Sequence, residues 1–239
     1  GARGLAHGHG QPEVVLDEVI SPTIRYRDGR FHFIKSFEEI EFYNFGGKHG
    51  TRKVMNIYGD EVATIPNYID TQRVEFKCGG KEIEFIKFLF ELGIMKKRKI
   101  SVKGVMVSPL SLFLNLATKI PTPKEMAKMY EEGIIQNAEF VSSVEVVGYQ
   151  HGTKILIKKT ASYPDLNTIF KKMKGSSYIA YPTGIAVAAF AGIMPELSEK
   201  GVYPPEALGS KIRKRIFVAM NREGVSFTES FSRAPKDLH

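Results

Sequence analysis

Apolar and polar residues alternate on both sides of the pair Asp28-Gly29, and this pattern predicts a β-hairpin over residues 24–34. An Asp-Gly pair suits the two central positions of a tight turn, where the backbone needs positive φ. Counting outward from the turn places Arg27 opposite Arg30 and gives the hairpin one apolar, aromatic face and one basic face. We therefore expect the apolar face to pack on a core and the basic face to meet water or an anionic neighbour.

Other stretches of the chain also have the two-residue period of strands. Strands are predicted at residues 39–43, 52–58, 73–78, 141–149 and 153–160, and the last two would form a second hairpin. The loop between the first two of these strands is rich in glycine, so it can change conformation.

Three helices follow from apolar spacing and from capping residues. Apolar positions over residues 83–92 predict an amphipathic helix that ends near Gly93. Ser108 before a proline predicts a second helix start, and Thr122 followed three residues later by Glu125 is a capping box that predicts a third.

A run of small apolar residues at 185–192 predicts a helix that begins after Thr183 and Gly184. Two interpretations of this helix stay open. Accessible backbone amides at its start would suit a carboxylate or a phosphate. Alternatively, the small side chains only allow a buried helix to pack closely against its neighbours.

The composition is that of an ordinary globular protein, since the 239 residues are 43% apolar and 25% charged. The longest nearly apolar stretch, residues 179–194, contains proline and glycine and is shorter than the roughly 20 residues that a bilayer requires. Residues 1–10 lack the apolar run of a secretory signal, and the single cysteine, Cys78, cannot form an internal disulfide. These features predict a cytoplasmic protein without a membrane partner.

The formal net charge of +8 comes from the later part of the chain. Its densest basic runs, at residues 96–99, 171–174 and 211–215, would suit phosphates, acidic substrates or an acidic partner. Lysines also gather at solvated helix ends, which is the alternative interpretation. No recognisable nucleic-acid-binding module interleaves aromatic and basic residues, so we expect no nucleic-acid partner.

Searches for chemical motifs give mostly negative results. The chain has no Gly-x-Gly-x-x-Gly or Walker loop for a nucleotide and no paired cysteines for zinc. His7-Gly8-His9 lies in a glycine-rich segment without the fixed geometry of a metal site, so we expect no bound metal. Cys78, beside Lys77, is either a nucleophile activated by the nearby cation or a small buried side chain.

Several short sequences occur in the same order as in one family of enzymes. They are Tyr26 to Gly29, Glu39 to Phe42, Ile57 to Pro66, Val74 to Gly80, Val105 to Pro109, Gly148 to Lys159, Tyr181 to Gly184 and Lys200 to Glu206. Over residues 20–228 the chain thereby resembles the carboxyl-terminal domain of saccharopine dehydrogenase and lysine 6-dehydrogenase-like proteins. The resemblance rests on the shared order of these short sequences along the chain.

The resemblance implies an α+β fold, with a mixed, largely antiparallel β-sheet and helices packed on one face. It implies a flexible or linker segment at residues 1–19, a substrate and dimerisation domain at 20–178, a helical part at 179–228 and a tail at 229–239. A homodimer is expected because the sheet face opposite the helices must be covered or kept polar.

In this family a Rossmann domain holds the nicotinamide, so the cofactor, NAD or NADP, would bind to such a domain in cis or in trans. The reaction would be hydride transfer between the cofactor and the CH–NH group of a small-molecule substrate, a lysine-derived amino acid. The chain departs from the family because the nucleotide-binding half is absent. It also reads Phe76-Lys77-Cys78-Gly79 where lysine 6-dehydrogenases have an arginine-containing strand end.

The resemblance also indicates which residues would form the site. Tyr58 and Asp60 match a substrate-facing Tyr-x-Asp region and would orient an ammonium or imine group and relay a proton. A turn or capping residue is the equally weighted alternative interpretation of Asp60. Thr64 would hydrogen-bond the substrate or cap a helix, and Lys77 would hold a substrate carboxylate or be a solvated lysine.

Four more residues are candidates for substrate binding. Thr183 and Gly184 would offer a helix amino terminus to an anion. His49 and Arg52 lie in or beside the glycine-rich loop, which either closes over a ligand or is a mobile surface loop. The alternative to a dehydrogenase part is a non-catalytic binding or assembly module for an anionic metabolite or an acidic partner.

Overall fold

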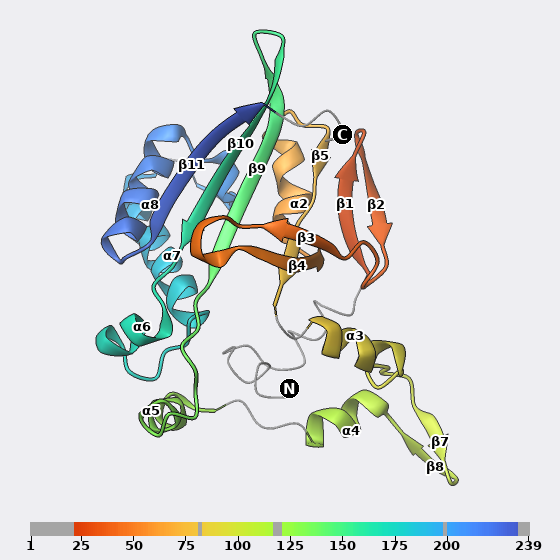
Figure 1. The fold of residues 1–239 in the computed structure, drawn as a ribbon. Coiled ribbons are helices and arrows are strands. Elements are labelled where there is room, and N and C mark those ends of the chain that lie inside the picture. Colours follow the sequence, from red (N-terminus) through yellow and green to blue (C-terminus); the bar gives the residue numbers. More distant parts are fainter. Residues whose placement is uncertain (1–21, 81–82, 117–120, 198–199, 234–239) are drawn as a thin grey trace. The chain divides into compact units, whose positions relative to one another are not determined.

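The structure, a computed structural model, describes residues 22–80, 83–116, 121–197 and 200–233 (Figure 1). The predicted linker at residues 1–19 and His7-Gly8-His9 lie outside these described residues. Contacts divide the chain into two compact units. Unit 1 comprises Gly1–Asn44, Thr51–Pro121 and Val202–Gly209, and unit 2 comprises Phe45–Gly50, Thr122–Gly201 and Ser210–His239.

The α+β class is confirmed, and all strand pairs among the described residues are antiparallel. These strands form four small sheets, in the orders β2-β1-β5, β3-β4-β6, β7-β8 and β11-β10-β9. No parallel sheet of the Rossmann type therefore occurs in the part of the chain that the structure describes.

Unit 1 has short strands and helices. Its strands are β1 (Thr23–Arg27), β2 (Arg30–Ile34), β3 (Glu41–Asn44), β4 (Thr51–Asn56), β5 (Arg73–Val74), β6 (Lys77–Gly79), β7 (Ile100–Val102) and β8 (Val105–Val107). Its helices and 3-10 turns are α2 (Asp60–Thr64), η3 (Ile65–Asn67), α3 (Ile83–Glu91), α4 (Pro109–Leu116) and η5 (Pro205–Ala207).

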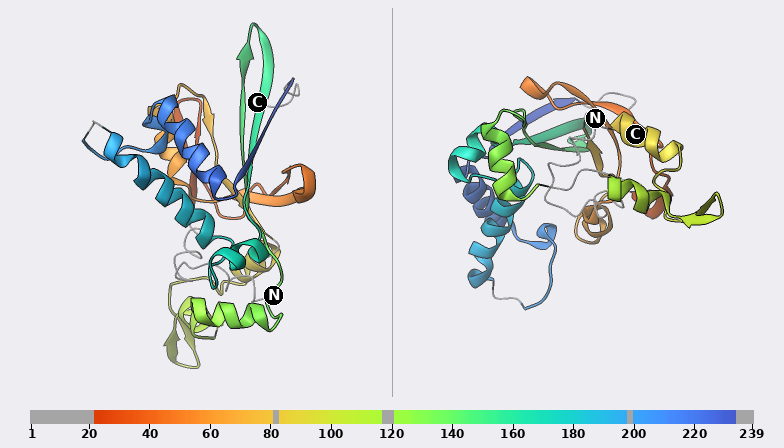
Figure 2. Two further views of the ribbon diagram at one scale, coloured as in Figure 1. Left: turned by 90° about the vertical axis from the view of Figure 1, so that its left-hand side faces the viewer. Right: turned by 90° about the horizontal axis from the view of Figure 1, so that it is seen from below.

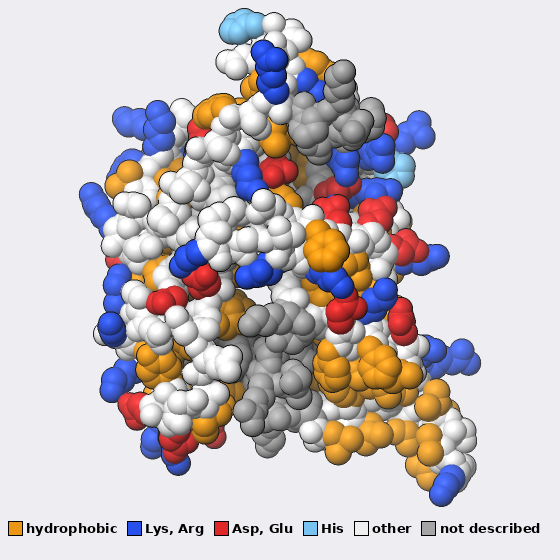
Figure 3. Space-filling view, viewed as in Figure 1, with side chains coloured by type: hydrophobic (Ala, Val, Ile, Leu, Met, Phe, Trp, Pro, Cys, Tyr) orange, Lys and Arg blue, Asp and Glu red, His pale blue; other side chains and the backbone are white. Residues whose placement is uncertain are grey.

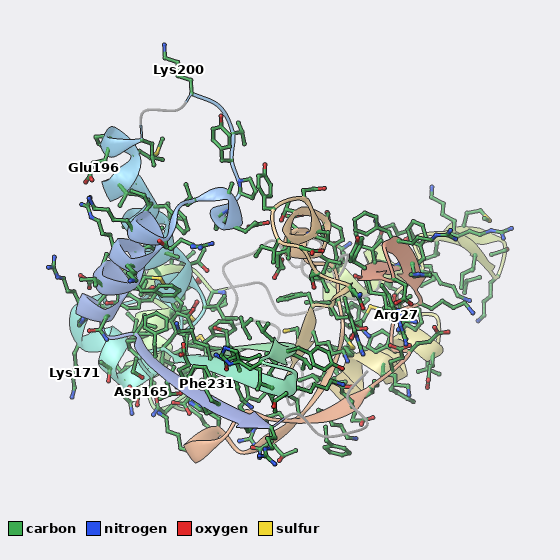
Figure 4. All side chains as sticks on the ribbon, turned by 90° about the horizontal axis from the view of Figure 1, so that it is seen from above. Arg27, Asp165, Lys171, Glu196, Lys200 and Phe231 are labelled. Carbon is green, nitrogen blue, oxygen red and sulfur yellow. The ribbon has the colours of Figure 1, made fainter. Side chains whose placement is uncertain are left out.

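The first hairpin is confirmed in detail, because β1 and β2 pair with Arg27 opposite Arg30 as the turn predicts. Asp28 and Gly29 have φ of 50° and 77°, the left-handed conformation that such a turn requires. β5 joins the outer edge of β1, with Arg73 opposite Arg27. Arg27 therefore lies at the end of a central strand (Figure 4).

The prediction of a single strand at residues 73–78 is wrong in one respect. The structure has two strands there, β5 and β6, which join different sheets. Between them, Phe76 accepts a hydrogen bond from the amide of Ile57 at 3.3 Å. Gly79 ends β6 where a Cβ atom would lie only 2.2 Å from the carbonyl oxygen of Lys53, so the close pairing with β4 needs glycine.

The predicted amphipathic helix is confirmed as α3, which buries Ile83, Ile86 and Leu89. Gly93 follows it with φ of 78° and ends it as expected. The core of unit 1 contains these three residues. It also contains buried side chains of β4, α4 and the connecting segments, namely Phe37, Met55, Met95 and Leu110.

Unit 2 has one long three-stranded sheet with helices beside it. Its elements are η2 (Gly47–His49), α5 (Pro123–Glu131), β9 (Val141–Gln150), β10 (Thr153–Ser162), α6 (Leu166–Lys172), α7 (Ala180–Ile193), η4 (Met194–Glu196), α8 (Ser210–Arg222) and β11 (Ser226–Arg233). The predicted hairpin is confirmed as β9 and β10, and the unpredicted β11 makes β10 the central strand.

Helices α7 and α8 pack against each other (Figure 2). Helix α8 contacts the sheet through Phe217 and Phe227, whose ring centroids are 4.9 Å apart. Further along β11, Phe231 is 66% exposed (Figure 4). Alternate residues of a strand face opposite sides, so Phe227 and Phe231 share one face of the sheet. The helix thus covers only part of that face.

A second core lies between α5 and α6 and contains Met126, Ile135, Leu166 and Phe170. Asp165 begins α6, and its carboxylate accepts a hydrogen bond from the Thr168 amide at 2.9 Å (Figure 4). Hydrogen bonds from the side chains of Thr168 and Asn137, together with this one from the Thr168 amide, lower the pKa of Asp165.

The capping box predicted at the start of α5 is confirmed. The Thr122 hydroxyl accepts a hydrogen bond from the Glu125 amide at 3.3 Å, and the Glu125 carboxylate accepts one from the Thr122 amide at 2.8 Å. Hydrogen bonds from Thr122 lower the pKa of Glu125. Two amide donors at the helix start are thereby satisfied.

Replacing Thr122 by alanine should lower the free energy of unfolding by about 1 kcal/mol, because the helix start loses its side-chain acceptor. Thermal denaturation followed by circular dichroism measures this effect. Lys124→Ala is the matched control, since this exposed residue lies on the same turn and takes no part in the capping box. Equal melting temperatures for the two variants would contradict the expected role of the cap.

Candidate functional site

Tyr58 and Asp60 lie two residues apart in unit 1, just after β4. Asp60 opens α2, and its carboxylate acts on the Tyr58 hydroxyl. Tyr58 is 45% exposed, so the pair is accessible from solvent. The hydrogen bond to Asp60 and the negative charge of Asp60 raise the pKa of Tyr58 above its ordinary value.

This pair combines a neutral phenol with a carboxylate acceptor. A carboxylate can attract an ammonium or iminium group, while a phenol can donate a hydrogen bond to a substrate nitrogen or oxygen. The arrangement is therefore suited to an amino or imino group. Its position at the start of a helix also agrees with the alternative interpretation of Asp60 as a turn residue.

Replacing Asp60 by asparagine should lower the pKa of Tyr58 towards the ordinary value of a phenol. The substitution removes the charge that disfavours the phenolate and weakens the hydrogen bond that favours the phenol. NMR titration of ring-labelled tyrosines measures this pKa. An unchanged Tyr58 titration in the variant would show that the two side chains are not coupled in solution.

Thr64 and Arg52 make only local hydrogen bonds among those observed. The Thr64 hydroxyl donates to the carbonyl oxygen of Asp60 at 3.3 Å, so it lies on the same short helix as Asp60. Arg52, near the start of β4, is exposed and donates to the carbonyl oxygen of Thr51 at 3.0 Å. Because Tyr58 follows the other end of β4, Arg52 and the Tyr58–Asp60 pair lie at opposite ends of this strand.

Lys77 is already held by carboxylates of the protein. Its ammonium lies 2.9 Å from the Glu41 carboxylate and 3.4 Å from the Glu75 carboxylate. These two acidic partners balance its charge, so the predicted role as an anchor for a substrate carboxylate loses its physical basis. Lys77 is also not the solvated lysine of the alternative interpretation, because its side chain is only 18% exposed.

Glu75 is the centre of an ionic network that the sequence did not predict. Its side chain is 9% exposed and contacts Arg73 at 2.9 Å, Lys77 at 3.4 Å and Arg25 at 4.0 Å. Burial raises the pKa of Glu75, but the hydrogen bond and the charge of Arg73, together with Lys77, outweigh burial and leave the pKa below its ordinary value. Arg25 also pairs with Glu39 at 2.8 Å, so the network links several strands of unit 1.

His49 lies in unit 2 and is 8% exposed, so it is not a residue of an open surface loop. Its Nε2 atom lies 3.0 Å from the Ser162 hydroxyl, and its Nδ1 atom lies 3.2 Å from the Glu139 carboxylate. Lys48 pairs with the same carboxylate. The loop is therefore held by side-chain contacts rather than free to move over a ligand.

The helix predicted after Thr183 and Gly184 starts earlier, at Ala180, so both residues lie inside α7. The Thr183 amide donates to the carbonyl oxygen of Ile179 at 3.2 Å, and Ser177 accepts from the amides of Ala180 and Tyr181. These amides are unavailable to an anion, so the predicted anion site at this helix start is wrong.

Gly184 instead lines an open cavity of about 480 Å³ between α7 and α8. Most of its lining is small and apolar, with Tyr181, Arg222 and Glu223 on its polar side. The Tyr181 hydroxyl donates to the carbonyl oxygen of Glu223 at 3.3 Å, and Lys172 lies 3.4 Å from that hydroxyl. The polar groups of Tyr181 and Glu223 are thus already paired with each other.

Tyr58 lies just before α2, and Asp60 and Thr64 lie on it, whereas the other predicted residues lie elsewhere. Cys78 is exposed, which excludes the interpretation of a small buried side chain. Sequence reasoning missed Ser162 and Glu139, because only the folded chain brings them to His49. Glu75 was missed because a glutamate in a strand-like segment carries no local signal of its ionic partners.

The described residues contain no group of three His, Cys, Asp or Glu side chains arranged to hold a metal ion. Among the helices within the same residues, none is both long and apolar enough to cross a bilayer.

Comparison with known proteins adds no relative. No protein-family model matches the chain, and a search of curated proteins finds no match either. The resemblance to the saccharopine dehydrogenase family therefore rests on the collinear sequences alone.

Proposed function

We propose that this chain is the substrate-binding part of an NAD(P)-dependent oxidoreductase of the saccharopine dehydrogenase type. It would act on the CH–NH group of a lysine-derived amino acid, in the cytoplasm. The nucleotide would bind to a Rossmann domain supplied in cis or in trans.

The observation that carries the proposal is the accessible Tyr58–Asp60 pair. The two residues lie in the sequence that matches the family's Tyr-x-Asp region, and the Asp60 carboxylate raises the pKa of Tyr58. Asp60 would hold the ammonium or imine group of the substrate, and the Tyr58 phenol would donate to it. The cofactor would carry the hydride, so the work of this chain would be positioning and electrostatics.

A thermal-shift screen of lysine-type amino acids tests the proposal, because a ligand that binds only the folded state raises the melting temperature. We expect a rise for the wild-type chain and its loss in Asp60→Asn. Asp70→Asn is the matched control, since Asp70 is another exposed carboxylate of unit 1. Equal shifts in Asp60→Asn and the wild type would contradict the role of Asp60.

Titration of NADH and NADPH with this chain alone should give no tight binding. The chain has no tryptophan, so the emission of the reduced nicotinamide can be followed without interference from indole. A dissociation constant in the micromolar range would contradict the proposal that the nucleotide site belongs to another domain.

A second candidate function is a non-catalytic assembly module, and exposed apolar side chains in unit 1 favour it. Figure 3 shows such side chains gathered over α3, α4 and the β7–β8 hairpin. Among them are Phe88, Leu92, Val105, Met106 and Leu116, which are 55–77% exposed. Surfaces of this kind often mark protein interfaces.

Assembly is tested by sedimentation over a range of protein concentrations. A homodimer that dissociates in Val105→Glu would place the interface on this surface. A wild-type chain that stays monomeric at all concentrations would contradict the proposed homodimer.

A further inference from the structure

A serine, a histidine and a glutamate of unit 2 contact one another in that order. The proposed dehydrogenase function assigns no role to this group. The Ser162 hydroxyl is 3.0 Å from Nε2 of His49, and the Glu139 carboxylate is 3.2 Å from Nδ1 on the other side of the ring. Each distance is within the range of a hydrogen bond. The order of groups is that of a nucleophile, a base and a carboxylate that orients the base.

The contact with Glu139 determines which nitrogen of neutral His49 carries the proton. A carboxylate accepts hydrogen bonds, so Nδ1 holds the hydrogen and donates it to Glu139. Nε2 then carries a lone pair, and the Ser162 hydroxyl donates to it. This is the tautomer in which a histidine can remove the proton of a serine hydroxyl.

The three groups are held by different but rigid parts of unit 2. Ser162 ends β10, which is paired on both sides, with Val141 and with Ser226. Glu139 lies just before β9, and the Tyr163 amide donates to the carbonyl oxygen of Phe140 at 3.2 Å, which fixes the two chain segments together. The serine and the glutamate therefore cannot easily move apart.

The loop that carries His49 is closed by its own hydrogen bonds. The Phe45 amide donates to the carbonyl oxygen of Gly50 at 2.9 Å, and the His49 and Gly50 amides donate to that of Gly46 at 3.2 and 3.3 Å. Glycine at positions 46 and 50 permits the positive φ of 82° and 59° that this turn adopts. With only 8% of its surface exposed, the ring is fixed in orientation, whereas Ser162 is partly exposed.

We propose that Ser162 is a nucleophilic serine that accepts acyl groups from activated esters, with His49 as its general base and Glu139 as the group that orients His49. The Tyr163 amide next to Ser162 is already bonded to Phe140, so it cannot stabilise an oxyanion. The substrate class is therefore esters with good leaving groups, such as phenyl esters, and not amides.

In the reaction, the oxygen of Ser162 forms a bond to the carbonyl carbon of the ester while its proton passes to Nε2 of His49. The bond from that carbon to the phenolate oxygen then breaks, and His49 returns the proton to the phenolate. Water next attacks the acyl-serine and gives up a proton through His49, which releases the carboxylic acid and restores Ser162. No oxidant, metal or nucleotide takes part, so failure of this proposal would leave the proposed dehydrogenase function untouched.

The test is labelling of the purified full chain with a fluorophosphonate, which bonds to an activated serine oxygen and releases fluoride. Peptide mass mapping should find the label on Ser162, and Ser162→Ala should abolish it. With p-nitrophenyl acetate as the substrate, His49→Asn should slow acylation on the order of a hundredfold, the size of a general-base contribution. Glu139→Gln should slow it as well, because the imidazolium loses a stabilising charge.

Ser143→Ala is the matched control. Ser143 lies on the same face of the sheet, and its hydroxyl is 3.1 Å from the Thr160 hydroxyl. Labelling should be unchanged in this variant. A folded wild-type chain that leaves Ser162 unlabelled would overturn the proposal, even if the histidine variant fails to fold. Acylation at the wild-type rate in folded His49→Asn would overturn it as well.

Discussion

Replacing Gly175 by alanine should lower the free energy of unfolding by about 3 kcal/mol, because two independent costs add. Gly175 has φ of 83°, a conformation that costs a residue with a Cβ atom about 1–2 kcal/mol. A Cβ atom there would also lie 2.3 Å from the carbonyl oxygen of Pro123. The first turn of α5 would have to shift, and forced repacking of this kind costs about 1–3 kcal/mol.

The matched control is Gly133→Ala, at the other end of α5. Gly133 has φ of 69°, but a Cβ atom there would have no neighbour within 4 Å. This variant therefore carries the conformational cost alone, about 1 kcal/mol. Urea denaturation followed by circular dichroism compares the two variants. Equal losses would show that the approach of Gly175 to Pro123 does not contribute to stability.

Local sequence features were sufficient to predict the structure wherever neighbouring residues determine the conformation. The Asp28-Gly29 turn fixed the register of β1 and β2, because only one pairing follows from a two-residue loop. The capping box at Thr122 likewise predicted the start of α5 correctly. Both depend on contacts within a few residues along the chain.

Long-range contacts explain what the sequence could not predict. His49 and Ser162 are 113 residues apart, and no spacing along the chain indicates that they are hydrogen-bonded. β11 has a mostly polar sequence and forms a strand because it pairs with β10. Helix α7 starts at Ala180, earlier than predicted, because the Ser177 side chain accepts a hydrogen bond from the Ala180 amide. This interaction lies outside the run of small residues that predicted the helix.

Several residues of the basic runs are paired in the structure. Lys172 pairs with Glu223 at 3.7 Å, Lys174 with Glu131 at 3.4 Å, and Arg215 with Glu196. All six side chains are well exposed, so these pairs contribute little stability. They support the interpretation that the lysines and arginines of these runs lie on solvated surfaces, where both signs of charge are interspersed.

Disruption of the ionic network of unit 1 should have the second large effect on stability. Replacing Glu75 by alanine should lower the free energy of unfolding by about 2 kcal/mol, because it leaves Arg73 without its carboxylate and removes one of the two partners of Lys77. Loss of one partner from a fully buried pair costs roughly 3–5 kcal/mol. We expect less here because Arg73 is 43% exposed and solvent screens its charge.

The contribution of Glu75 to the free energy of unfolding should fall as the pH is lowered. Glu75→Gln tests this, because glutamine keeps the shape of the side chain and removes its charge. The folded state holds the pKa of Glu75 below its unfolded value of about 4.3, so ionised Glu75 stabilises the fold above that pH. This contribution is lost as the pH falls through the lower, folded-state pKa. The difference in unfolding free energy between wild type and Glu75→Gln should therefore be largest near pH 7 and shrink below about pH 4.

Urea denaturation at a series of pH values, followed by circular dichroism, measures this difference. Glu38→Gln is the control, because Glu38 pairs with Lys35 at 3.6 Å while both side chains are more than half exposed. Its effect should stay within about 0.5 kcal/mol at every pH. If the difference between wild type and Glu75→Gln were the same at pH 3 and pH 7, the charge of Glu75 would not be what stabilises the network. In that case the shape and hydrogen bonds of Glu75, and not its charge, would hold Arg73 and Lys77 in place.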